Sequence, residues 1–111
     1  MNKENTFYIC YGDFDGISLY EVSGKLVPKR TDMFMHVDHE GFIRVTDLNT
    51  GYLIATHPLA EIAVRNAIMR IDRDPQHTAS ARMRAENRIT TAGLGFPVNL
   101  LPIKNYKKSS L

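Results

Sequence analysis

The sequence of 111 residues has one cysteine, no tryptophan and no long apolar run. Because Cys10 is alone, the chain by itself can close no disulfide framework and build no thiolate metal cluster. No apolar run is as long as a membrane span, and the N-terminus lacks the apolar core of a signal peptide. We therefore expect a single globular domain in the cytoplasm, with no membrane partner.

The common signatures of enzyme active sites are missing as well. The sequence contains no serine elbow, no P-loop and no dinucleotide-binding glycine motif. Its net charge of +2 is too small to predict nonspecific DNA binding, although many of the arginines lie between residues 65 and 88. We therefore expect a protein that is not an enzyme, with no catalytic residues, no cofactor and no specific DNA binding.

The first half of the chain has the alternating pattern of short strands separated by turn-forming residues. The connections are too short for crossover helices, so the pattern predicts an antiparallel meander of about five strands. Ser23-Gly24 predicts one of the turns, and Val27-Pro28 predicts a short edge segment, because proline is excluded from central strands. The predicted strands cover residues 7–11, 17–22, 33–37, 42–48 and 52–55.

Two helices are predicted after the strands. The first covers residues 56–74, with Pro58 in its first turn and Thr56 or His57 as its cap. Its helical periodicity gives one broad apolar face and a second apolar strip, which predicts cover from the sheet on one side and from a second helix or another subunit on the other. The broad face comprises Ala60, Ala63, Val64, Ala67, Ile68 and Ile71, and the strip comprises Leu59, Ile62 and Met69.

The second helix and the tail complete an α+β domain. Asp74 caps the second helix, Pro75 occupies its first position, and Gly93 ends it. The expected organisation is a sheet over residues 1–57, two helices over 58–92 and an extended tail over 93–111. The apolar tail residues expected to pack on a neighbouring surface are Phe96, Val98, Leu100 and Ile103.

The densest group of metal-ligand residue types lies around a predicted turn. His36 and Asp38 would share one face of a strand, and His39 and Glu40 follow directly. Polar residues also gather at turns for structural reasons, and no second set of ligands is near in sequence. We favour the turn and expect no metal site. Cys10 lies in a strand pattern, where a buried structural thiol is the more common role.

The arginines of the helices are the better functional candidates. Arg84 and Arg88 lie one helical turn apart and can converge on one anion, and His77 shares their face. On the first helix Asn66 and Arg70 belong to a polar line that also contains Arg73. An asparagine amide can read the edge of an adenine. The alternative is a solvated charged face in which carboxylates such as Asp74 and Glu86 pair with the arginines.

The helical half also resembles a known family. An antiparallel sheet followed by HPLAEIAVRNAIMRI and RMRAENR is similar to the phage Thoeris anti-defence proteins of the first type, which are cyclic-nucleotide sponges. The resemblance implies capture of cyclic ADP-ribose isomers without cleavage, and in some members of cyclic oligonucleotides. It also implies assembly as dimers or hexamers built from dimers, with ligands at subunit junctions, in the cytoplasm of the bacterial host if the protein is phage-encoded.

The resemblance further implies roles for individual residues. Asn66 would read the base, and Arg84 and Arg88 would hold the phosphates. From the residue pattern alone, Arg70 and His77 are further candidate ligand-binding residues, because they lie on the same helix faces as Asn66 and the arginine pair. The family has an aromatic residue ahead of the position of Pro58, where this chain has Thr56 and His57. Two other functions remain open: a protein-binding inhibitor or adaptor that uses the apolar helix or the tail, and a small hydrolase that uses the histidine cluster.

Overall fold

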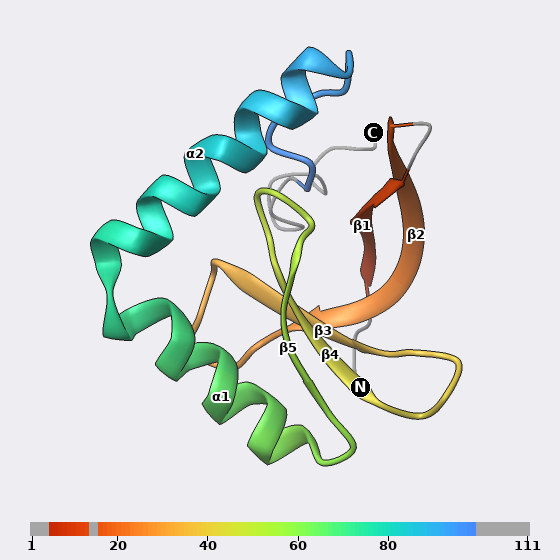
Figure 1. Ribbon diagram of the computed structural model, residues 1–111. Coiled ribbons are helices and arrows are strands. Elements are labelled where there is room, and N and C mark those ends of the chain that lie inside the picture. The colour runs from red at the N-terminus through yellow and green to blue at the C-terminus, as the bar shows by residue number, and fades with distance from the viewer. Residues whose placement is uncertain (1–4, 14–15, 100–111) are drawn as a thin grey trace, which may run out of the picture.

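The computed structural model describes residues 5–13 and 16–99 of the chain (Figure 1). Its strands form one antiparallel sheet in the order β1-β2-β3-β4-β5, and two helices follow. This arrangement confirms the predicted α+β fold. The tail residues Leu100 and Ile103 lie outside the described residues. The elements are β1 (Asn5–Asp13), β2 (Gly16–Leu26), β3 (Met33–Val37), β4 (Ile43–Asp47), β5 (Leu53–His57), α1 (Ala60–Arg73) and α2 (Pro75–Thr91).

Strand β2 is longer than predicted and joins the two parts of the sheet. Ser23 and Gly24 do not form a turn, because they pair with β1 inside the ladder. The next two residues of β2 pair with β3 instead, and a Cβ atom at Gly24 would collide with the carbonyl oxygen of Met35. Glycine is therefore needed here because two strands approach closely, not because the chain turns. Figure 1 shows β2 as the long curved strand.

The connection between β2 and β3 is a tight turn rather than the predicted edge segment. The amide of Arg30 donates to the carbonyl oxygen of Val27 at 3.0 Å, with Pro28 and Lys29 between them. Lys29 has a φ of 67°, the left-handed conformation that the third residue of a type II turn requires. Proline fits the position before it because its ring presets φ.

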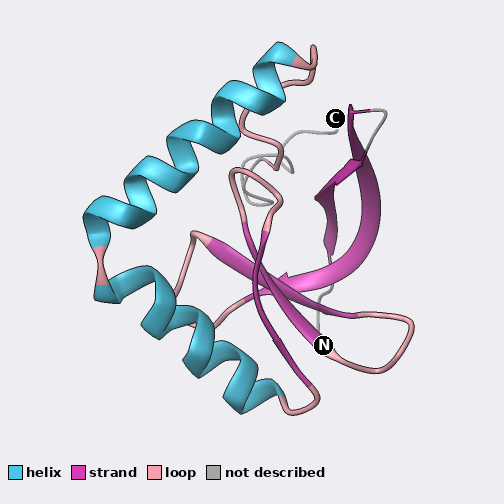
Figure 2. Ribbon diagram, viewed as in Figure 1, coloured by secondary structure: helices cyan, strands magenta, loops and turns pink. Residues whose placement is uncertain are grey.

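Helix α1 covers β4 and β5 with the broad apolar face that its periodicity predicts. Ala63 and Ala67 are fully buried against a core that includes Val45 and Ile54. The second apolar strip is different, because Leu59 is 58% exposed and Met69 is 54% exposed. Among the described residues α2 leaves this strip uncovered. In Figure 2 the two helices form an open V around the β4–β5 hairpin, and α2 does not fold back along α1.

The ends of the helices match two of the predictions and contradict one. The Asp74 carboxylate accepts from the amide of His77 at 3.1 Å, and Gly93 ends α2 with a φ of 84°. The predicted cap of α1 is wrong, because α1 begins at Ala60 and its cap residue Leu59 makes no side-chain capping bond. The reason is that β5 extends to His57, which still pairs with β4, so Pro58 lies before the helix.

Residues after α2 return to the sheet and hold its two halves together. The Asn99 side chain accepts from the amide of Tyr8 at 2.7 Å and donates to the carbonyl oxygen of Leu48 at 2.9 Å. The amide of Val98 donates to the carbonyl oxygen of Asn49 at 2.7 Å. Asn99 is buried, so its polar groups are satisfied by backbone partners on β1 and on the β4–β5 hairpin. Neither described helix is long and apolar enough to cross a bilayer.

Candidate functional site

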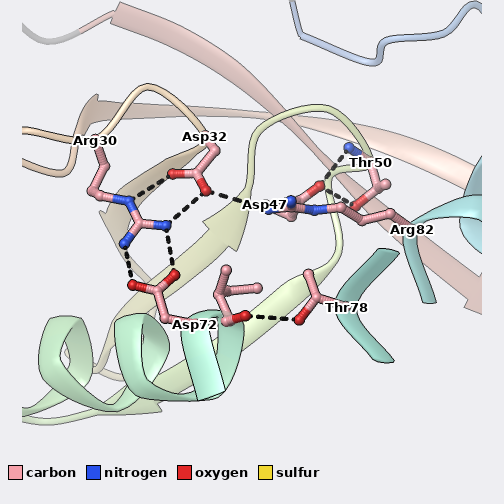
Figure 3. A network of polar contacts seen from close by, with 8 residues as sticks. Arg30, Asp32, Asp47, Thr50, Asp72, Thr78 and Arg82 are labelled. Atoms are coloured by element: carbon pink, nitrogen blue, oxygen red, sulfur yellow. Dashed lines mark hydrogen bonds and ion pairs between the residues drawn. The ribbon is translucent and has the colours of Figure 1, made fainter. Parts of the chain in front are cut away.

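A network of charged side chains holds α2 and the end of α1 to the sheet (Figure 3). Arg30 donates to Asp32 at 2.9 and 3.0 Å and to Asp72 at 3.1 Å. Arg82 reaches Asp32 at 3.4 Å from α2. Burial alone would raise the pKa of Asp32, but the hydrogen bond from Arg30 and the charges of both arginines lower it overall. The carboxylate therefore stays charged as the shared partner of two guanidinium groups.

The second centre of the network is the buried carboxylate of Asp47. Its Oδ2 atom accepts from the amide and the hydroxyl of Thr50 at 3.1 and 2.9 Å, and Oδ1 accepts from Arg82 Nε at 2.8 Å. Arg82 is therefore the counterion of a charge inside the protein. Sequence reasoning assigned no role to Arg82, because Asp47 precedes the turn formers Asn49, Thr50 and Gly51, where an exposed aspartate is the ordinary expectation.

A pocket of about 220 Å³ lies between the two helices and the β4–β5 hairpin. We call it the inner pocket. Most of its lining is apolar, and the polar side chains include Arg70, Arg82 and His77. Its one carboxylate is Asp47, which is already paired with Arg82. The full lining is Asp47, Thr50, Tyr52, Leu53, Ile54, Arg70, Ile71, His77, Thr78, Ala81, Arg82 and Ala85.

A second hollow of about 410 Å³, the outer groove, runs between β5 and α1. It brings together three residues that the sequence singled out, Thr56, Asn66 and Arg70, and adds Arg73. The polar line of Asn66, Arg70 and Arg73 on α1 therefore lies next to β5. Among the described residues no carboxylate lines the groove, whose lining there is Leu53, Ile54, Ala55, Thr56, Asn66, Met69, Arg70 and Arg73.

Arg70 stands between the two hollows and lines both. One of its terminal nitrogens donates to the carbonyl oxygen of Ile54 at 2.8 Å. A guanidinium has five N–H donors, and within residues 5–13 and 16–99 this is the only acceptor bonded to Arg70. The side chain is thus held at one point while most of its donors and its charge remain available to an anion.

The other predicted residues lie outside these two hollows. Arg84 is exposed and makes no ion pair with any described residue, and the guanidinium of Arg88 lies 5.6 Å from the centre of the Tyr52 ring. Asp74 and Glu86, the alternative partners, make no ion pair within the described part of the chain. His57 accepts from the amide of Leu59 at 3.0 Å through Nδ1. That Arg84 and Arg88 share an anion stays a prediction.

The histidine cluster has the geometry of a turn. The Asp38 carboxylate accepts from the amides of Glu40 and Phe42 at 2.9 and 3.0 Å and lies 3.5 Å from Arg44. His36 is buried, and its Nδ1 atom has no hydrogen-bond partner. Burial, reinforced by the charge of Arg44, lowers the pKa of His36. No three His, Cys, Asp or Glu side chains among the described residues are placed to hold a metal ion.

Cys10 is a buried thiol on β1, beside the tip of the β4–β5 hairpin. Its amide donates to the carbonyl oxygen of Gly51 at 2.8 Å, and its side chain is hydrogen-bonded to Tyr52. Burial raises the pKa of the Cys10 thiol, against smaller opposing effects of Tyr52 and Arg88. The thiol is therefore the form expected at neutral pH, in keeping with the structural role assigned to it from the sequence.

Fold and site together define a small α+β protein with a cation-lined groove beside an apolar pocket. Comparison with known proteins gives no match to a family model, to a curated protein or to a solved structure.

Proposed function

We propose that the protein is a non-enzymatic binding protein that sequesters anionic nucleotide second messengers in the outer groove. The observation that carries the proposal is the position of Arg70, held by one hydrogen bond with its remaining donors facing two hollows. Guanidinium forks match phosphate oxygens in geometry and charge. Arg73 adds a second cation to the groove, and no carboxylate lining it competes for either.

Two neighbouring side chains favour a nucleotide over a simple anion. Asn66 carries both a donor and an acceptor, which is what the edge of an adenine requires, and Thr56 adds a hydroxyl. A guanidinium offers only N–H donors and a side-chain amide is not a base, so the side chains of the groove bind a ligand without acting as a general base. We therefore propose that the ligand is held and released unchanged.

The biological role follows from the resemblance of the helical half to the anti-defence sponges. We propose that the ligands are cyclic ADP-ribose isomers, with cyclic oligonucleotides as further ligands, and that their capture blocks bacterial anti-phage immune signalling.

We also propose a homo-oligomer, a dimer or a hexamer of dimers, in the host cytoplasm. Its support is the apolar strip of α1, where Leu59 and Met69 are more than half exposed. Light scattering at micromolar concentration tests the assembly, and a monomer mass would contradict it.

The test of the groove is calorimetric titration with cyclic ADP-ribose isomers. Arg70→Ala should weaken binding about tenfold or more, because a charge-assisted hydrogen bond contributes about 1.5–3 kcal/mol. Arg70→Lys should recover only part of the loss, since an ammonium lacks the fork. Arg65→Ala is the matched control, because Arg65 is an exposed arginine on the same helix that does not line the groove.

Two outcomes would contradict the proposal. One is that Arg70→Ala binds as tightly as the wild type. The other is that cyclic ADP-ribose recovered after heating contains a steadily growing linear product, which would point to an enzyme.

A second candidate function, a protein-binding inhibitor or adaptor, is favoured by the same exposed strip on α1. Leu59 and Met69 would then contact another protein rather than a second copy of this chain. Cross-linking from Met69→Cys separates the two, because a homo-oligomer gives cross-links between identical chains and an adaptor requires a different partner.

A further inference from the structure

We propose that the inner pocket is the base compartment of the same site. In this arrangement a planar heterocyclic base enters the inner pocket beside Tyr52, its phosphates lie in the outer groove, and Arg70 stands between the two. The inference rests on the proposed function and specifies the class of ligand: a nucleotide with one base inserted and its phosphates outside, rather than a bare phosphate or a sugar phosphate.

The two hollows are neighbours that share a wall. Leu53, Ile54 and Arg70 line both of them. One ligand can therefore contact both hollows while remaining in contact with the same guanidinium. The hydrogen bond of Arg70 to the carbonyl oxygen of Ile54 fixes that guanidinium at the boundary.

The inner pocket is mainly apolar, whereas the outer groove carries positive charge. A nucleotide has the same division, with a flat base at one end and anionic phosphates at the other. Apolar side chains form most of the inner pocket, among them Ile71, Ala81 and Ala85. Half of the eight residues that line the outer groove are polar or charged, namely Thr56, Asn66, Arg70 and Arg73. Binding sites commonly combine an apolar body with a few placed polar groups. The base of a nucleotide suits the first hollow, and its phosphates suit the second.

Tyr52 provides an aromatic surface that is held in place. Its hydroxyl is hydrogen-bonded to Cys10, and the guanidinium of Arg88 lies 5.6 Å from its ring centre. Tyr52 lines the inner pocket and Arg88 does not, so Arg88 contacts the ring without being part of the pocket lining. A fixed ring loses little conformational freedom when a base stacks on it, and stacking of this kind tolerates different bases.

The volume of the inner pocket also restricts what can enter. At about 220 Å³ it is smaller than the 300–1,000 Å³ typical of sites that enclose a drug-sized ligand. It exceeds the roughly 150 Å³ of a cavity that holds benzene. A single ring system therefore fits while a whole nucleotide does not, and the rest of the ligand must lie outside, where the groove is.

The test compares cyclic ADP-ribose with inorganic pyrophosphate in calorimetric titrations of three proteins. Ala81→Leu fills the inner pocket from α2, and Ala79→Leu is the control because Ala79 is exposed on the same helix and does not line the pocket. Wild type and Ala79→Leu should bind cyclic ADP-ribose about tenfold or more tighter than pyrophosphate. Ala81→Leu should lose that advantage and keep its affinity for pyrophosphate.

A second pair of variants keeps the test decisive if Ala81→Leu lowers the melting temperature. Tyr52→Leu should bind cyclic ADP-ribose about tenfold more weakly than the wild type, and Tyr52→Phe, which keeps the ring but loses the hydrogen bond to Cys10, should lose less affinity than Tyr52→Leu. Unchanged binding by both Ala81→Leu and Tyr52→Leu, with a loss in Arg70→Ala, would overturn the base compartment and leave the groove in place. If the wild type bound neither probe, the proposed function would fail, and this inference with it.

Discussion

The molecule contains two groups of arginines. One group is paired with carboxylates and holds parts of the fold together, and the other is unpaired among the described residues and keeps a positive charge that can bind a ligand. Arg30 and Arg82 each contact two carboxylates. Arg70 and Arg73, on α1, make no ion pair with any carboxylate in the described part of the chain. Paired arginines have their charge satisfied inside the protein, so they serve the fold. The others keep a charge that a ligand can use, and this difference separates arginines that look alike in sequence.

Position in the fold explains the difference. Arg82 is 35 residues from Asp47 in sequence and Arg30 is 42 residues from Asp72, so each pair joins segments that folding brings together. Arg70 and Arg73 instead border a groove next to β5, where Thr56 is exposed and no acid is present. Three predictions are given in order of their expected effect on the free energy of unfolding, and the first and the third test this comparison of arginines.

Removing a paired arginine should have the largest effect. Arg82→Ala leaves Asp47 as a buried charge whose only remaining partner among the described residues is Thr50. Breaking a buried pair costs about 3–5 kcal/mol, and because the Arg82 side chain is 33% exposed we expect about 2–3 kcal/mol. Urea unfolding followed by circular dichroism measures the change.

The matched control is Arg84→Ala, on the same helix and two residues away. Arg84 is exposed and has no ion-pair partner among the described residues, so its removal should change stability by about 0.5 kcal/mol or less. Equal losses in the two variants would show that the contact with Asp47 does not hold α2 to the sheet.

Local signals in the sequence were sufficient for much of the fold. Asp74 and Pro75 mark the start of α2, and Gly93 marks its end, because each supplies what one helix end requires. The periodicity of α1 placed Ala63 and Ala67 in the core. These features depend on residues close in sequence, which is why they were predictable.

Features that depend on distant segments were not predictable in the same way. Gly24 has the local look of a turn, and only the approach of β3 shows that it lies within a strand. Arg82 and Arg84 are alike in local sequence, and only the buried carboxylate of Asp47 distinguishes them. The sequence did indicate the polar line of Asn66 and Arg70, but it could not show that β5 completes a groove beside it.

The second prediction is that acidification lowers the free energy of unfolding because His36 is buried in the folded state. Burial lowers the pKa of His36 in the folded state, so the unfolded chain binds a proton more readily. Stability should therefore fall as pH drops through the unfolded histidine value of about 6.5 toward the lower folded one. Asp32, whose folded pKa is also lowered, adds a loss in the same direction at more acidic pH.

The measurement is urea unfolding at steps between about pH 7.5 and 5. His36→Phe removes the titrating group while keeping a ring next to Phe34, whose ring centre lies 6.3 Å from that of His36. The variant should lose most of the pH dependence in this range, whereas a control variant at exposed His39 should keep it. An unchanged slope in His36→Phe would assign the acid sensitivity to other groups.

The smallest effect on stability should come from the arginine pair of α2. Both Arg84 and Arg88 are exposed, and the contact of Arg88 with the Tyr52 ring is worth about 0.5–1 kcal/mol at such a site. The double variant Arg84→Ala, Arg88→Ala should therefore unfold within about 1 kcal/mol of the wild type. Its affinity for cyclic ADP-ribose should fall about tenfold or more if the pair holds phosphates, since each charge-assisted contact contributes about 1.5–3 kcal/mol.

The two readouts separate the possible roles of the pair. Neither arginine lines the groove of its own chain, so a loss of affinity without a loss of stability would place the pair at a junction between subunits. Arg→Lys at either position should then restore only part of the binding, because the charge returns without the fork. If the double variant bound cyclic ADP-ribose as tightly as the wild type, Arg84 and Arg88 would be solvent-exposed residues without a role in binding. Arg70 would then remain the main ligand-binding residue.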